Sequence, residues 1–238
     1  MSRGGALVTG SATGIGRGIA LALAREGYDV AVHYRRSAAE AEATRTEIGG
    51  LGVRSIALQA DLTDRVAAAG LVHAAQDELG SLAVLVNNVG NYVYRRLDEL
   101  SLEEWDDVFA TNFDATFATC RAAVPLMRAA GNGRIVNLGY AGAQNLVARP
   151  NLAAYAIAKT GVVLLTKALA RAEAANGITA NVVAPGVIEN SATKPLAEIP
   201  AGREGRIEEV AAAVLYFVSP EAGYVTGQVL EVAGGWNL

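Results

Sequence analysis

Short apolar runs, many of them rich in β-branched residues, alternate with longer alanine-rich segments along the whole chain. The runs are almost continuously apolar, which is typical of strands buried on both faces of a parallel sheet. The longer segments have helical periodicity and connect each run to the next. The expected strands are ALVTG (6–10), DVAVHY (29–34), RSIALQAD (54–61), LAVLVNN (82–88), RIVNLG (134–139), ITANVVAPG (178–186) and VLEVAGG (229–235).

The boundaries of the helical segments carry start and stop signals. Asp64 and Ser101 are placed to act as N-caps, and Gly27, Gly80 and Gly177 follow helices as C-terminal stops. No repeat, low-complexity tract or linker interrupts the alternation, so the pattern predicts one doubly wound α/β domain over residues 1–238. Helices are expected over 15–26, 38–48, 64–79, 103–130, 152–175 and 207–218.

Composition narrows the class of protein. Of the 238 residues, 52% are hydrophobic and 18% are charged, which is enough apolar material for a sizeable core. The net charge is −4 and lysine and arginine are scattered, so we expect neither a nucleic-acid partner nor an anionic-membrane surface. Glycine and charged residues interrupt the apolar stretches before they reach the ~20 residues of a membrane-spanning helix.

Cysteine and histidine usage indicates no disulfide and no metal site. Cys120 is the only cysteine, which excludes an intramolecular disulfide, and we expect it to pack as a small hydrophobic residue. His33 and His73 have no cysteine or acidic cluster at ligand spacing. No targeting segment is recognisable at the start of the chain, so we expect a soluble, cytoplasmic protein.

The first expected strand runs into the glycine-rich turn TGSATGIG (9–16). Glycine lets the backbone approach a pyrophosphate, and the following helix N-terminus offers free N–H groups. The spacing is GxxxGxG, and glycine-rich connections also arise for packing reasons alone. The residues expected at a nucleotide are Gly10, Thr13, Gly14, Ile15 and Gly16.

The second expected strand ends in HYRRS, without the acidic residue that usually holds the adenosine ribose. Arg35, Arg36 and Ser37 suit a 2′-phosphate instead, so NADP(H) is favoured over NAD(H). The alternative is a solvated pair of arginines at a strand end. Asp61, followed by Leu62, could accept a hydrogen bond from adenine or could cap the next helix.

These features occur together with NNVG (87–90), Asn112, YAIAK (155–159), APG (184–186) and YVTGQVLEVAGG (224–235). In this order and at these intervals they resemble the short-chain dehydrogenase/reductase family over essentially the whole chain. The resemblance is strongest to its 3-oxoacyl-carrier-protein reductases and, through VHYRRSAAEA, to its pteridine reductases. It implies a Rossmann-type sheet of about seven parallel strands, a nicotinamide cofactor, and a homotetramer or homodimer built on the helices around 103–130 and 152–175.

Carbonyl reduction leaves charge on oxygen, and Tyr155 is the candidate proton donor. Lys159 lies one helical turn on, where a cation would favour the phenolate. The resemblance implies that Lys159 also holds the nicotinamide ribose and that Asn112 supports a water-linked proton path. The alternative is a tyrosine and a lysine on an ordinary amphipathic helix. By resemblance, further cofactor contacts come from Asn88, Gly90, Pro185, Gly186, Ile188 and Asn190.

Two segments depart from the family pattern. The catalytic serine position is Tyr140, and no serine or threonine occurs from 139 through 159. Losing one oxyanion donor typically costs about 10²–10³ in rate, although pteridine reductases carry aspartate at this position. The phenol reaches far beyond a serine hydroxyl, but AQNLVARPN is about two residues longer than usual. The substrate-covering segment, residues 189–201, is short, and Asn190 occupies a position usually held by threonine.

The loop after NNVG adds Tyr92 and Tyr94, which could stack on a flat substrate or pack on the surface. Arg95 and Arg96 could meet an anionic substrate or face water. The sequence therefore predicts an NADP(H)-dependent reductase or dehydrogenase that interconverts a carbonyl and an alcohol in a small molecule. The alternatives are a pteridine-type reductase and a catalytically weak NADP(H)-binding protein.

Overall fold

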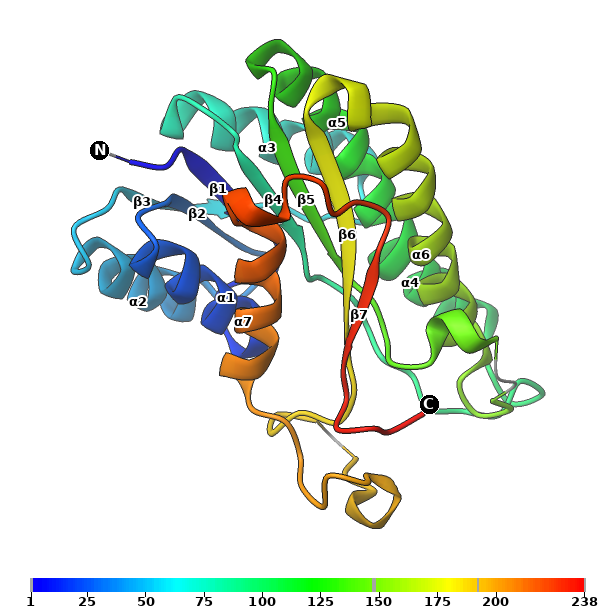
Figure 1. Ribbon diagram of the computed structural model, residues 1–238. Helices are drawn as coiled ribbons and strands as arrows, with labels where there is room; N and C mark the ends of the chain where they lie inside the picture. The colour runs from blue at the N-terminus through cyan, green and yellow to red at the C-terminus, as the bar shows by residue number, and fades with distance from the viewer. Residues whose placement is uncertain (1, 147–148, 192, 238) are drawn as a thin grey trace.

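The structure is a computed structural model that describes residues 2–146, 149–191 and 193–237. Seven parallel strands form its sheet, in the order β3-β2-β1-β4-β5-β6-β7 (Figure 1). The strand order reverses between β1 and β4, which is where ligands bind in open α/β sheets. The strands are β1 (Gly5–Val8), β2 (Asp29–Tyr34), β3 (Ser55–Gln59), β4 (Val84–Asn87), β5 (Gly133–Leu138), β6 (Ile178–Pro185) and β7 (Val229–Val232).

Helices cover both faces of the sheet, as the alternating pattern predicts (Figure 1). On one face α1 (Gly14–Arg25), α2 (Ala38–Gly49) and α7 (Ile207–Val218) pack over an apolar core that includes Ile19, Val32 and Phe217. The other face is covered by α3 (Arg65–Leu79), α5 (Ala115–Ala130) and α6 (Ala153–Glu173), with α4 (Leu102–Phe109) against α6. The α/β Rossmann-type fold with a doubly wound parallel sheet is confirmed.

Several expected strands end earlier than the apolar pattern suggested. The expected strands 54–61, 82–88 and 229–235 shorten to Ser55–Gln59, Val84–Asn87 and Val229–Val232. The residues beyond the ladder are Ala60 and Asp61 after β3, Asn88 after β4 and residues 233–235 after β7. In Figure 1 the segment after β7 lies at the lower edge of the sheet. Ala60, Asp61 and Asn88 line the cavities described below.

The cap signals are confirmed. The Asp64 carboxylate accepts hydrogen bonds from the N–H groups of Val66 and Ala67, at 2.8 and 3.4 Å. Ser101 and Glu104 form a capping box at the start of α4. Gly80 ends α3 at φ 76°, a left-handed conformation that glycine adopts without strain.

The expected helix over 103–130 is interrupted. Residues Ala110–Asp114 form a π-turn between α4 and α5. Such bulges are common at functional sites because they redirect side chains. Here the bulge contains Asn112, which is fully buried.

A chain of buried side-chain hydrogen bonds holds the centre of the sheet against its helices. Thr119 of α5 donates to Asn87 Oδ1 at 2.7 Å, and Asn87 donates to Asn137 Oδ1 at 2.9 Å. Asn137 in turn donates to Thr166 Oγ1 of α6 at 2.9 Å. Because α6 also carries Tyr155, this network fixes the position of Tyr155's helix relative to β4 and β5.

One expectation about apolar stretches is wrong. The helical segment Ala153–Asn176, which contains α6, is long and apolar enough by length and composition to cross a membrane, with a mean hydropathy of 1.3. Its charged residues, Lys159, Lys167, Arg171 and Glu173, are too few to interrupt the apolar stretch. In the fold this segment packs on β6.

Candidate functional site

The carboxyl ends of the central strands border a cavity of about 440 Å³. A second cavity of about 380 Å³ lies beside it, and Gly90 borders both. The second cavity is lined by Gly10, Arg35, Asp61 and Leu62 from the expected set. The first is lined by Ile15, Asn88, Gly90, Asn112, Tyr140, Tyr155, Lys159, Pro185, Gly186, Ile188 and Asn190.

The glycine turn is shaped so that only glycine fits. Gly10 and Gly14 have φ of 63° and 57°. A Cβ at Gly16 would stand 2.3 Å from the Gly10 carbonyl oxygen. Thr13 is the N-cap of α1, and its side chain makes no capping hydrogen bond. The first N–H groups of α1 therefore have no side-chain cap, as an anion-binding helix N-terminus requires.

His33 supports this turn from β2. Its Nδ1 accepts a hydrogen bond from the Gly10 N–H at 2.9 Å, and its Nε2 lies 3.1 Å from the Ala60 carbonyl oxygen. Burial lowers the pKa of His33 to about 4, so the ring is neutral at pH 7. His33 therefore orients the turn, a role that the sequence did not indicate.

The segment after β2 presents the expected basic residues. Arg35 Nη1 lies 3.8 Å from Asp61 Oδ2, and both side chains are largely exposed. Arg36 is exposed as well, and Ser37 is the N-cap of α2. Asp61 does not cap α3, because Asp64 does; Asp61 instead accepts hydrogen bonds from the Thr63 N–H and hydroxyl at 3.0 and 2.8 Å.

Tyr155 and Lys159 line the same cavity from one face of α6, as their spacing predicted. Lys159 is 4% exposed, and its Nζ donates to the Leu138 carbonyl oxygen at 2.7 Å. Burial lowers the pKa of Lys159 to about 8. Burial, followed by the nearby phenols of Tyr92 and Tyr140, raises the pKa of Tyr155 above its ordinary value. The ammonium lies 5.8 Å from the Tyr155 ring centroid.

Asn112 faces Lys159 across Gly90. The Asn112 amide nitrogen donates to the carbonyl oxygens of Asn91 and Val108, at 2.8 and 2.9 Å. Its Oδ1 is buried and has no hydrogen-bond partner among the described residues. A Cβ at Gly90 would stand 2.3 Å from this oxygen and 3.4 Å from Lys159 Nζ, so glycine keeps the passage between them open.

Tyr140 packs beside the candidate proton donor. Its ring lies edge-on to Tyr155, with centroids 5.6 Å apart. The side chain is buried, and its hydroxyl has no hydrogen-bond partner within the described part of the chain. Burial raises the pKa of Tyr140, so the phenol is a neutral donor at pH 7. A buried hydroxyl without a hydrogen-bond partner lowers the stability of the fold, and a ligand that accepts its hydrogen bond removes this cost.

The segment after β6 forms another side of the cavity. Ile188 lies in a parallel bridge with Gly205, and its N–H donates to Ser191 Oγ at 3.0 Å. Asn190 lines the cavity and its Nδ2 reaches back to the glycine turn, 2.9 Å from where a Cβ of Gly14 would stand.

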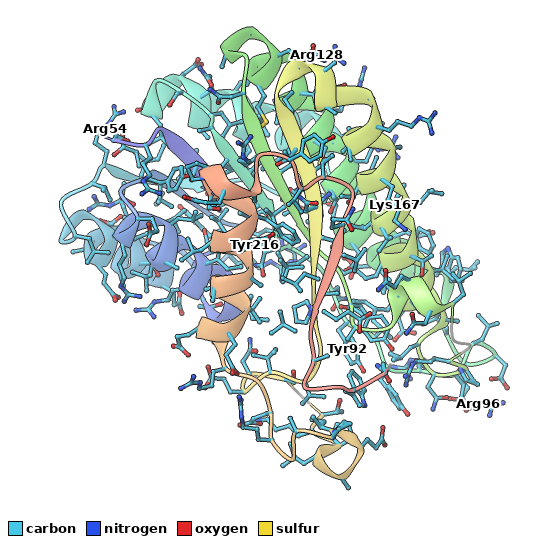
Figure 2. All side chains as sticks on the ribbon, viewed as in Figure 1. Arg54, Tyr92, Arg96, Arg128, Lys167 and Tyr216 are labelled. Carbon is cyan, nitrogen blue, oxygen red and sulfur yellow. The ribbon has the colours of Figure 1, made fainter. Side chains whose placement is uncertain are left out.

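In the loop after β4, Tyr92 lies at the cavity, whereas Arg95 and Arg96 lie on the surface. Tyr92 borders the cavity, and its ring lies edge-on to Tyr155 with centroids 5.2 Å apart. Figure 2 shows Arg96 projecting outward from the molecule. Arg95 pairs with Glu104 at 2.9 Å and Arg96 with Asp98 at 3.0 Å, so both arginines form exposed ion pairs.

Sequence reasoning missed seven residues that line the first cavity: Leu138, Gly139, Leu152, Val187, Ser191, Thr193 and Trp236. A signal for Trp236 did exist, since residues after the last parallel strand emerge at the same edge as the site. Ser191 and Thr193 are small hydroxyls in the short segment after β6.

The remaining candidate groups are structural. Burial raises the pKa of the Cys120 thiol to about 12, so it packs as an unreactive thiol. Among the described residues, no cluster of three or more His, Cys, Asp or Glu side chains could hold a metal ion.

Comparison with known proteins places this geometry in a family. The chain is 41% identical to the 3-oxoacyl-[acyl-carrier-protein] reductase FabG of Staphylococcus aureus and 38% identical to that of Vibrio cholerae. These matches cover 98% of this chain and 98% and 97% of the two relatives.

Solved structures of other proteins are also similar to this chain over almost its whole length. A putative short-chain alcohol dehydrogenase from Sinorhizobium meliloti superposes with a TM-score of 0.93 at 34% identity, over 99% of this chain and 97% of the other. Acetoin dehydrogenase from Salmonella typhimurium gives 0.91 at 31% identity, over 99% and 96%. The protein family described as enoyl-(acyl carrier protein) reductase matches residues 10–237. The chain belongs to the short-chain dehydrogenase/reductase family of oxidoreductases.

Proposed function

We propose that this protein is an NADP(H)-dependent reductase that converts the ketone of a small 3-oxoacyl thioester to the alcohol. The observation that carries the proposal is the placement of Tyr155 and Lys159 in a cavity that also contains Ile15 of the glycine turn and the residues after β6. The FabG relatives, at up to 41% identity over nearly the whole chain, support the substrate class.

The residues present fit a dinucleotide. The missing Cβ atoms at Gly16 and Gly90, and the uncapped start of α1, leave backbone surfaces that a phosphate and a ribose can approach. The turn residues Gly10 and Thr13–Gly16 would hold the pyrophosphate, and Asp61 and Leu62 the adenine. Asn88, Gly90 and Lys159 would hold the second ribose, and Pro185, Gly186, Ile188 and Asn190 the nicotinamide. When bound, the cofactor supplies the hydride.

The preference for NADP(H) rests on the end of β2. Arg35 and Arg36 are exposed there, and Ser37 stands at the N-terminus of α2. A 2′-phosphate would receive paired guanidinium hydrogen bonds, whereas the unphosphorylated ribose would find no carboxylate at this position. NADPH and NADH titrations followed by fluorescence test this. Equal affinity for both, or no loss of NADPH affinity in Arg36→Ala, would contradict it.

Tyr155 is proposed to donate the proton to the substrate oxygen. The phenol is protonated at pH 7, which is the state that reduction requires. Burial raises its pKa and so makes it a weaker acid, which is why a cation beside it matters for donation. Lys159, with a pKa of about 8, is mainly cationic at that pH and stabilises the phenolate that remains after donation. The Asn112 Oδ1, buried and without a partner among the described residues, is proposed to hold a water that returns the proton through Lys159.

Tyr140 is proposed to steady the substrate oxygen in place of a serine. Its hydroxyl is buried at the cavity and has no hydrogen-bond partner within the described residues. A substrate oxygen could accept the hydrogen bond that this hydroxyl is free to donate. The edge-on contact with Tyr155 holds the two phenols on the same side of the cavity.

The test of the proposed function is a substrate panel. NADPH oxidation is measured with acetoacetyl thioesters, simple diketones and dihydropteridines. Turnover of acetoacetyl thioesters is expected. Turnover of dihydropteridines alone would favour the pteridine-type alternative, for which Tyr92 at the cavity is the relevant ring. Tight NADPH binding without turnover on the whole panel would favour a nucleotide-binding protein.

We also propose that the chain assembles into a homo-oligomer through α5 and α6. A mainly apolar groove lies along these helices and is lined by Phe113, Phe117, Leu164 and Leu165, together with Arg65 and Asp114. Leu164 is 70% exposed, Ile157 on the same helix 52% and Phe117 38%. An exposed apolar face of this kind is typical of a subunit interface.

A further inference from the structure

The C-terminal tail, Gly234–Asn237, crosses the carboxyl edge of the sheet after β7 (Figure 1). Gly234 and Gly235 turn the chain with φ of 61° and 86°, which is why the expected strand to residue 235 stops at Val232. The Gly234 carbonyl oxygen accepts a hydrogen bond from the Ala201 N–H at 3.0 Å. The tail therefore lies against the short segment that precedes α7.

Asn237 ties the tail to the loop between β5 and α6. Its Nδ2 donates to the Ala141 carbonyl oxygen at 3.2 Å, and its carbonyl oxygen accepts from Asn145 Nδ2 at 2.8 Å. Its Oδ1 accepts a hydrogen bond from Arg149. These three contacts link the tail to the loop that carries Tyr140.

Trp236 is held from several sides. Its Nε1 donates to Glu198 Oε2 at 3.3 Å, and the Arg149 guanidinium lies 5.5 Å from its ring centroid. The ring is edge-on to Tyr140, with centroids 6.4 Å apart. On the other side, Cε3 lies 3.4 Å from where a Cβ of Gly186 would stand. Trp236 thus occupies the space between Tyr140 and the end of β6, and it lines the cavity.

The space left for substrate is limited. The cavity of about 440 Å³ also includes Ile15, Asn88, Gly90, Pro185 and Asn190, the residues assigned to the cofactor above. Aromatic rings and one aliphatic side chain border the rest: Tyr92, Tyr140, Tyr155, Trp236 and Leu152. The hydrogen bonds of Trp236 and Asn237 must break before this side of the cavity can widen.

We propose that the C-terminal tail is a fixed wall of the substrate cavity and that Trp236 restricts it to short-chain carbonyl substrates. The inference rests on the proposed function and adds a residue that sets substrate size. Long acyl chains would meet the indole ring, whereas an acetoacetyl group would fit beside Tyr155. One methylene in an apolar pocket changes specificity by about 10–200-fold, so removing the ring should be plainly measurable.

The test compares kcat/KM for acetoacetyl, 3-oxohexanoyl and 3-oxooctanoyl thioesters. The wild type should prefer the shortest. Trp236→Ala should raise the ratio of 3-oxooctanoyl to acetoacetyl activity at least about tenfold. Trp236→Phe keeps one six-membered ring but loses the fused five-membered ring and the hydrogen bond to Glu198, so its ratio should lie between those of the wild type and Trp236→Ala. Thermal unfolding and NADPH affinity verify that each variant is folded.

A binding measurement separates this inference from the proposed function. The chain has two tryptophans, and Trp105 stacks on Phe109 with centroids 4.7 Å apart. In Trp105→Phe the remaining emission reports on Trp236. With NADP⁺ present, an acetoacetyl thioester should quench that emission at lower concentration than the 3-oxooctanoyl thioester does.

Absence of turnover in the wild type would overturn the proposed function, and the emission measurement would still test the tail. An unchanged chain-length ratio in folded, active Trp236→Ala would overturn the inference. So would equal quenching by short and long thioesters in the Trp105→Phe protein.

Discussion

Lys159 is a charged group in a place that is unfavourable for charge. It is 4% exposed, and burial lowers its pKa from 10.5 to about 8. Because the unfolded chain binds the proton more tightly than the folded chain does, the buried ammonium destabilises the fold at every pH below about 8. This cost falls as the pH rises from about 8 toward 10.5. Its size at pH 7 is on the order of 3 kcal/mol.

Lys159→Met should therefore stabilise the protein while abolishing turnover. The gain in the free energy of unfolding at pH 7 should be about 1–3 kcal/mol, since the hydrogen bond to the Leu138 carbonyl, worth about 1 kcal/mol, is lost. Urea unfolding at pH 7 and pH 10 measures it, and the gain should shrink at the higher pH. A destabilised variant at pH 7 would show that the ammonium is not a net cost.

The ring and the hydroxyl of Tyr140 have different roles, so a substitution that removes only the hydroxyl tests its role alone. Tyr140→Phe keeps the edge-on contact with Tyr155 and removes only the unpaired hydroxyl. If that hydroxyl holds the substrate oxygen, kcat/KM should fall about 10²–10³-fold with NADPH affinity unchanged. Tyr140→Ser is the companion variant: a large gain in kcat/KM would mean that the phenol does not replace the serine.

At the scale of the elements, the turn between β1 and α1 depends on one close contact. A methyl group at position 16 would lie 2.3 Å from the Gly10 carbonyl oxygen, so Gly16→Ala must push α1 away from the turn. NADPH affinity should fall at least about tenfold, because the N–H groups of the helix would no longer point at the phosphate.

Gly70→Ala is the matched control in α3. A Cβ there meets nothing within 4 Å, and alanine is the better helix former by about 1 kcal/mol. This variant should unfold at a higher denaturant concentration and bind NADPH as the wild type does. Equal NADPH affinity in both glycine variants would contradict the role given to the turn.

The elements themselves were largely predictable, because each depends on local signals. Apolar periodicity located all seven strands, and Asp64 and Ser101 marked helix starts through their side-chain hydrogen bonds. The π-turn at Ala110–Asp114 was not predictable, since the same residues fit a continuous helix. The contact of Asn112 with the Asn91 carbonyl, distant in sequence, accompanies the altered winding.

The residues of the site also differ in how far the sequence alone predicts them. Tyr155 and Lys159 were predictable, because their spacing on one helix fixes their common face. For Trp236 the sequence could indicate only the edge of the sheet, because its contact with Tyr140 depends on two glycines with positive φ and on hydrogen bonds to segments far away in the sequence. The neutral, orienting role of His33 likewise follows from tertiary contacts with Gly10 and Ala60.

At the scale of the whole molecule, the proposed homo-oligomer depends on one exposed apolar face. The apolar groove between α5 and α6 leaves Leu164 largely exposed. Leu164→Glu should shift the protein to a smaller species in analytical ultracentrifugation, because a carboxylate buried between subunits would lack a partner. Leu51→Glu, at an exposed turn after α2, is the control and should leave the assembly unchanged. If both variants sediment like the wild type, this face is not the interface.

The central claim is that Tyr155 passes a proton to the substrate oxygen. The most direct measurement is the rate of NADPH oxidation by Tyr155→Phe at saturating NADPH and acetoacetyl thioester, with cofactor affinity determined separately. The ring contacts with Tyr92 and Tyr140 do not involve the hydroxyl, so the cavity should be preserved. We expect kcat to fall at least about 10³-fold with NADPH affinity unchanged. A rate within about tenfold of the wild type would show that another group supplies the proton.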